Sequence, residues 1–104
     1  MLTNEMVLEI FEDYLEKDQA MEVVQTRHGM AAMLWDNAGE DWSEVVCCPT
    51  PERLFDELLD FCTAYQEYLI LQGGDQDDLT AENREHVQMM VQRYQEKRKE
   101  AEMV

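Results

Sequence analysis

The fold is decided by the stretch Met21-Glu-Val-Val-Gln-Thr-Arg-His-Gly-Met-Ala-Ala-Met-Leu-Trp35. Its two apolar segments, Met21–Thr26 and Met30–Trp35, have the length and composition of β-strands. The tripeptide Arg27-His28-Gly29 separates them and supplies a glycine for a turn position with positive φ. The stretch therefore predicts a β-hairpin.

A third strand is expected directly after this hairpin. Asp36–Asp41 is rich in turn-forming residues, and Trp42–Cys47 follows with a strand-like composition. Pro49 then ends regular pairing, because proline has no N–H to donate to a sheet. The three segments predict an antiparallel meander.

Three helices are expected around the meander, because apolar residues recur there at helical spacing behind good N-cap residues. The first covers about residues 4–16 and the second about residues 51–71. The third begins at about residue 81 and continues into the charged tail. The first should bury Val7, Ile10, Phe11, Tyr14 and Leu15, and the second should bury Leu54, Leu58, Phe61, Cys62, Tyr65 and Leu69. Thr80 is expected to cap the third helix, which Val87, Met90, Val91 and Tyr94 mark.

These elements predict a single α+β domain over residues 1–104. The order is helix, three-stranded antiparallel meander and two helices (αβββαα), with the helices packed on one face of the sheet. No apolar run approaches the ~18 residues of a membrane span, and acids stand where a signal peptide needs a basic start. A cytoplasmic location is therefore expected.

The charge is large, negative and unevenly distributed. The chain has 24 Asp and Glu against 8 Lys and Arg, for a formal net charge of −16. Residues 1–79 hold 19 acids and 3 bases, whereas residues 80–104 hold 5 of each. Phosphates would repel such a surface, so direct binding to nucleic acid is excluded as a first choice, but binding to a nucleic-acid-binding protein is not.

The nucleophiles and metal ligands form no catalytic or metal-binding pattern. Three cysteines are an odd number that argues against a disulfide framework, and Cys62 lies on the apolar stripe of its helix. His28 and His86 have no motif around them, and Ser43 lacks a nucleophile elbow. We therefore expect no enzyme activity and no metal.

The acidic and glycine-rich loop after the second helix resembles neither a calcium site nor a phosphate loop. Counted from Asp75, Thr80 stands where an EF-hand needs glycine, and His86 stands where it needs glutamate. Gly73-Gly74 is followed by acids and has no lysine, so it is interpreted as a helix stop. No cofactor is expected.

The acids of the first and second expected helices form rows. Glu5, Glu9 and Asp13 are spaced four residues apart, and Glu52, Asp56 and Asp60 repeat that spacing. Four helical residues advance ~6 Å, which is of the order of the phosphate spacing along a nucleic-acid strand. Such rows can bind a basic groove, or they can serve only to keep the protein soluble. The residues expected to bind a partner are Glu5, Glu9, Glu12, Asp13, Glu16, Asp56, Asp60, Glu67, Asp75, Asp77, Asp78 and Trp42.

Trp35 and Trp42 flank the second turn, and two interpretations of them stay open. They can pack against each other across the strands, or one of them can be an exposed anchor for a partner. The second interpretation is stronger for Trp42, which lies close to Asp36, Glu40 and Asp41.

In size, acidity and lack of catalytic motifs, the chain resembles the small inhibitors of phages and conjugative elements. These are the anti-CRISPR and antirestriction proteins, several of which imitate DNA. The resemblance covers length and composition alone. It implies a partner class, namely a nuclease or CRISPR-type effector whose basic channel the protein would occupy.

Two other functions are compatible with the sequence. In one, the chain is an antitoxin-like interaction module that binds through its last helix, with Arg93, Lys97, Arg98 and Lys99. In the other, it is a homodimer that buries the exposed sheet face and part of its eight methionines. Loss of binding on reversal of the acids favours the inhibitor, whereas loss on reversal of the bases favours the module.

Overall fold

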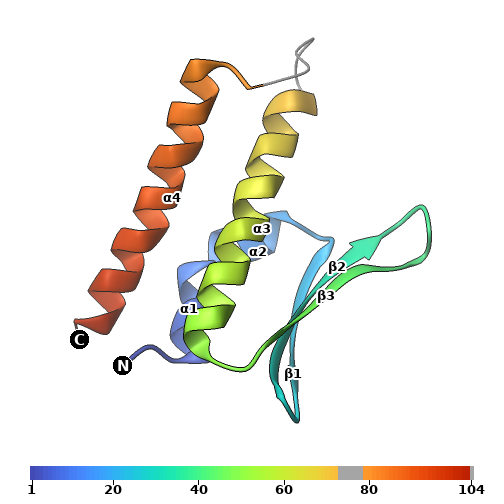
Figure 1. Ribbon diagram of the computed structural model, residues 1–104, viewed down its shortest axis with the longest axis vertical. Coiled ribbons are helices and arrows are strands. Elements are labelled where there is room, and N and C mark those ends of the chain that lie inside the picture. Colours follow the sequence, from blue (N-terminus) through green and yellow to red (C-terminus); the bar gives the residue numbers. More distant parts are fainter. Residues whose placement is uncertain (73–78, 104) are drawn as a thin grey trace.

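The computed structural model describes residues 1–72 and 79–103. It confirms the predicted order of one helical segment, three antiparallel strands and two long helices (Figure 1). The elements are α1 (Asn4–Ile10), α2 (Glu12–Lys17), β1 (Met21–Thr26), β2 (Gly29–Asp36), β3 (Asp41–Cys48), α3 (Pro51–Gln72) and α4 (Ala81–Glu102).

The sheet is a meander of the order β1-β2-β3. Gly29 closes the first hairpin with a φ of 109°. A Cβ atom at this position would lie 2.9 Å from the carbonyl oxygen of Cys48 and 2.9 Å from the Cα atom of Pro49. Position 29 therefore requires glycine for two reasons, namely the positive φ of its backbone and the close approach of the end of β3.

The register places apolar side chains on both faces of the sheet. Val23, Ala32 and Val46 are paired neighbours that pack into or against the core. The residues that alternate with these along the strands face the opposite side of the sheet, where Val45 is 60% exposed. The helices thus contact one face, with α3 lying against β2 and β3.

The first predicted helix is interrupted, which corrects the expectation of one continuous helix to about Glu16. Phe11 leaves the helical conformation, with φ of −99° and ψ of 14°, and separates α1 from α2. Its side chain is fully buried and stacks on Tyr94, with 4.7 Å between ring centroids. Phe11 also meets Phe55 at 5.3 Å, so the break lies where three helices meet.

The core lies between the sheet and the four helices, with Tyr94 as the contribution of α4. On α3 it contains Leu54, Leu58 and Cys62, as predicted, together with Phe55, which was not predicted. Phe61 and Tyr65 of the predicted stripe are half-buried and pack against this core. The expected burial of Leu69 is wrong, because its side chain is 40% exposed. The reason is visible in Figure 1, where the upper halves of α3 and α4 extend beyond α1, α2 and the sheet.

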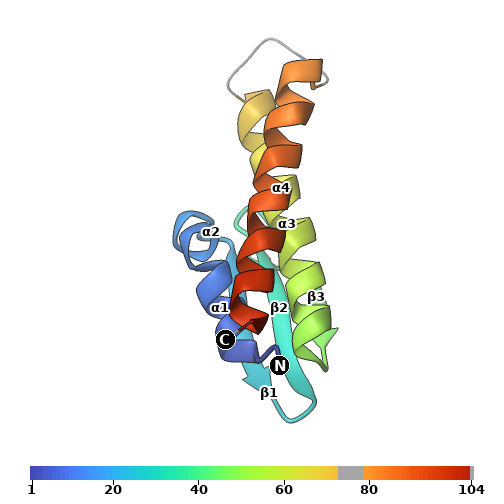
Figure 2. The same ribbon diagram turned by 90° about the vertical axis from the view of Figure 1, so that its left-hand side faces the viewer.

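The molecule is thin, with Cα extents of 43 × 37 × 18 Å. Figure 2 shows α1 and α2 on one side of α4 and the lower half of α3 on the other, with the strands behind. Within the described ranges, no helix is both long enough and apolar enough to cross a membrane.

Candidate partner-binding surface

The first acidic row follows α1 and α2. Thr3 is the N-cap of α1, because its hydroxyl accepts a hydrogen bond from the Met6 backbone N–H at 3.2 Å. The side chains of Glu5, Glu9, Glu12 and Glu16 are exposed on both sides of the break at Phe11. Among the residues described, none of these four acids forms an ion pair. Their charges are therefore available to a partner.

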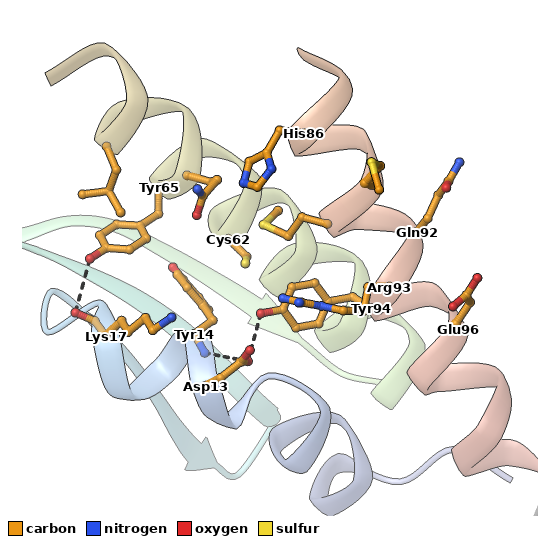
Figure 3. Close-up of a pocket in the computed structure, with 14 residues that line it drawn as sticks. Asp13, Tyr14, Lys17, Cys62, Tyr65, His86, Gln92, Arg93, Tyr94 and Glu96 are labelled. Atoms are coloured by element: carbon orange, nitrogen blue, oxygen red, sulfur yellow. Dashed lines mark hydrogen bonds between the residues drawn. The ribbon is translucent and has the colours of Figure 1, made fainter. Parts of the chain in front are cut away.

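Asp13 differs from the rest of this row. It is half-buried, and its Oδ1 accepts hydrogen bonds from the Tyr14 backbone N–H at 2.8 Å and from the Tyr94 hydroxyl at 2.9 Å (Figure 3). Burial alone would raise the pKa of Asp13, but these two hydrogen bonds, with Lys97 and Arg93 nearby, lower it below its ordinary value. Asp13 thus joins α2 to α4 within the molecule.

The second acidic row follows the exposed side of α3. Glu52, Asp56 and Asp60 are exposed along it, and Glu67 is half-buried. Next to the row, Arg53 pairs with Glu57 at 3.0 Å. Asp75, Asp77 and Asp78 lie outside the described residues.

The helical elements that carry the two rows lie on different sides of α4. In Figure 2, α1 and α2 lie on one side of α4, and the lower half of α3, which carries Glu52, Asp56 and Asp60, lies on the other. The exposed acids of the two rows are therefore carried by different helical elements.

The tryptophans form a cross-strand pair. Trp42 pairs with Trp35 next to a register shift in β2, and their ring centroids lie 5.0 Å apart at an angle of 76°. Both side chains are half-buried. This geometry agrees with the packing interpretation for both, and it leaves part of Trp42 accessible.

Three of the four bases in the cluster on α4 contact aromatic rings of the molecule, and Lys99 is exposed. Lys97 lies 5.1 Å from the centre of the Tyr94 ring, and Arg93 lies 5.8 Å from it. Arg98 lies 4.8 Å from the centre of the Phe55 ring and pairs with Glu102 at 3.0 Å. The Arg98–Phe55 contact joins α4 to α3, whereas the contacts of Arg93 and Lys97 with Tyr94 lie within α4 itself. The Arg98 contact thus gives this base a structural role.

A groove of about 700 Å³ lies between α2, α3 and α4 (Figure 3). Cys62 lines its floor, and burial raises the pKa of this thiol to about 11. Burial also raises the pKa of Tyr94, and its hydrogen bond to Asp13 adds to that effect. The Cys62 thiol and the Tyr94 hydroxyl therefore keep their protons at neutral pH.

The thiols are free and separate. Cys47 is exposed, whereas Cys48 and Cys62 are buried. In the part of the chain that the structure describes, no three side chains of His, Cys, Asp or Glu come together to hold a metal ion.

The sequence interpretation missed a second cavity, of about 440 Å³, which we call the Asp18 cavity. Its lining includes Asp18, Tyr14, Trp35, Phe61, Tyr65 and Tyr68. The spacing of Phe61, Tyr65 and Tyr68 on α3 was the available signal, because it places three aromatic rings along one side of a helix. Nothing in the sequence placed Asp18 or Trp35 beside them.

In comparisons with known proteins, the chain matches no family model, no curated protein and no solved structure.

Proposed function

We propose that this protein is a non-enzymatic inhibitor that occupies the basic nucleic-acid-binding groove of a nuclease or CRISPR-type effector as a mimic of DNA. The observation that carries the proposal is the pair of exposed acidic rows, Glu5, Glu9, Glu12 and Glu16 on one side and Glu52, Asp56 and Asp60 on the other. A groove that encloses a duplex meets negative charge on both of its walls. A thin molecule whose exposed acidic rows stand on different helices can offer negative charge to both walls of such a groove.

The cost of the rows supports a functional role. Like charges four residues apart on a helix destabilise it by about 0.2–0.5 kcal/mol per pair. Glu52, Asp56 and Asp60 form two such pairs, and Arg53 beside them is already paired with Glu57. A surface that served stability alone would mix the signs of its charges.

The test begins with affinity capture of the tagged chain from cells that express candidate nucleases. The captured partner is then titrated with a row variant carrying Glu9→Gln, Glu12→Gln, Asp56→Asn and Asp60→Asn. The matched control carries Glu22→Gln, Glu44→Gln, Glu85→Gln and Glu100→Gln, which removes the same number of exposed acids outside the rows. Asp13 is left intact because it holds Tyr94.

The row variant should bind roughly tenfold or more weakly than the control variant, and wild-type binding should weaken as salt rises. DNA should compete with the protein for the partner. Equal loss in the two variants would show that net charge alone matters and would contradict the mimic. Capture of a partner without a nucleic-acid-binding groove would also contradict it.

A further inference from the structure

The Asp18 cavity brings aromatic rings from three parts of the chain around one carboxylate. Tyr14 comes from α2, Trp35 from the end of β2, and Phe61, Tyr65 and Tyr68 from α3. The Trp35 backbone N–H donates to the carbonyl oxygen of Ala20 at 2.8 Å, which fixes the α2–β1 turn against the end of β2. The cavity is thus held by the fold and does not depend on a free loop.

Among the described residues, Asp18 is the one charged residue that is buried. It is 7% exposed, and its Oδ2 accepts a hydrogen bond from the Tyr14 hydroxyl at 2.7 Å, while its Oδ1 accepts one from the Ala20 backbone N–H at 3.2 Å. Across residues 1–72 and 79–103, no Lys, Arg or His forms an ion pair with it. A carboxylate has about four acceptor positions, so two hydrogen bonds leave it room for a further donor.

A buried carboxylate without a cation is expensive, because a low-dielectric site removes the solvation of its charge. A donor that brings positive charge into the cavity would offset that cost. The aromatic walls favour the same kind of ligand, because the faces of aromatic rings attract cations. The carboxylate and the aromatic rings therefore both favour a cationic ligand.

The cavity is accessible from solvent. Tyr68 on its wall is 58% exposed, and Ala64 beside it is exposed and has a small side chain. The volume of about 440 Å³ is enough for one long side chain of another protein.

We propose that the Asp18 cavity binds the guanidinium group of one arginine side chain from the basic partner protein. Arginine fits better than lysine, because a planar guanidinium stacks on aromatic rings and donates two parallel hydrogen bonds to a carboxylate. The identity of the partner rests on the proposed function. The cavity would give that partner a specific anchor, which charge rows alone do not provide.

The test uses the full chain and three peptides: acetyl-Gly-Arg-Gly-amide, its citrulline analogue and its lysine analogue. Citrulline keeps the shape of arginine and removes the charge. Binding is followed by the NMR signal of the Trp35 indole N–H, which belongs to a residue of the cavity wall. The arginine peptide should bind about tenfold more tightly than the citrulline peptide. Equal affinities of these two would overturn the proposal, and a lysine peptide that binds as tightly as arginine would overturn the assignment to arginine.

Two single variants separate the cavity from the general negative charge. Asp18→Asn should abolish the preference for arginine over citrulline, whereas Glu22→Gln, which removes one exposed acid on β1, should retain it. Ala64→Leu should also abolish the preference by filling the cavity without changing the charge, and it replaces the first variant if Asp18→Asn does not fold. A preference that survives both Asp18→Asn and Ala64→Leu would place arginine on the acidic rows and overturn the proposal.

The two proposals fail separately. The peptide titration needs no partner, so it can succeed even if the captured partner has no nucleic-acid-binding groove. Conversely, the row variant can lose binding to the partner while the peptides show no selectivity for the cavity.

Discussion

The Tyr94 hydroxyl donates a hydrogen bond to the carboxylate of Asp13 at 2.9 Å, across 81 positions of the chain. The same tyrosine ring stacks on Phe11, two residues before Asp13, with 4.7 Å between centroids. One side chain of α4 thus contacts both the break between α1 and α2 and the first turn of α2. This contact connects the N-terminal helices to the C-terminal helix.

Replacement of Tyr94 by phenylalanine should lower the free energy of unfolding by about 1–2 kcal/mol, because the ring stack stays and the hydrogen bond to a carboxylate is lost. Urea denaturation followed by circular dichroism measures the change. Tyr68→Phe is the matched control, since Tyr68 is 58% exposed, and it should change the midpoint little. Equal effects of the two variants would show that the Tyr94 hydroxyl contributes nothing.

Asp13 should make stability depend on pH in the acidic range. Its pKa in the folded protein lies below the ordinary value of 3.8, so its hydrogen bonds stabilise the folded state when it is ionised. This contribution is complete above the ordinary pKa and is lost as the pH falls through the lower folded value. The stability difference between wild type and Asp13→Asn should therefore be largest near neutral pH and should shrink in strong acid. A difference that is constant across denaturation curves from neutral to acidic pH would contradict this assignment.

Leu58→Ala should cost about 2–5 kcal/mol, because Leu58 is fully buried on α3 and its truncation leaves a cavity. Thermal unfolding should show a clear fall in the midpoint. Leu69→Ala on the same helix should cost far less, since Leu69 is 40% exposed. An unchanged midpoint for Leu58→Ala would show that α3 does not pack as described.

The thiols should differ in reactivity under native conditions. Cys47 is exposed, whereas burial raises the pKa of Cys48 and raises that of Cys62 to about 11. A thiol reagent at neutral pH should therefore label Cys47 rapidly and the other two only after denaturation. Mass spectrometry of labelled peptides measures the order. Rapid native labelling of Cys62 would contradict its place in the core.

The order of the elements could be predicted because its signals are local. Gly29 marks a turn by its conformational freedom, Pro49 ends the sheet, and Thr80 caps α4 by accepting from the Asn83 backbone N–H at 3.1 Å. Each of these effects acts within a few residues. A single sequence contains them directly.

Other features could not be predicted, because distant residues cause them. The helix breaks at Phe11 where its ring meets Tyr94 and Phe55, and periodicity alone continues the helix through that point. The row spacing gave Asp13 the same role as Glu9, and only the position of Tyr94 distinguishes them. The Asp18 cavity likewise exists because β2 carries Trp35 to a turn that lies far from it in the sequence.

The attachment of α4 also has a consequence for local unfolding. Of its 22 residues, only Val87 and Tyr94 are buried, whereas β2 alone buries Met30, Ala31 and Ala32 in the middle of the sheet. Amide protons of α4 can therefore exchange with solvent through detachment of this helix alone, whereas those between β2 and its neighbours require the whole domain to open. Each detachment would uncover the ring of Phe11 while the meander stays folded.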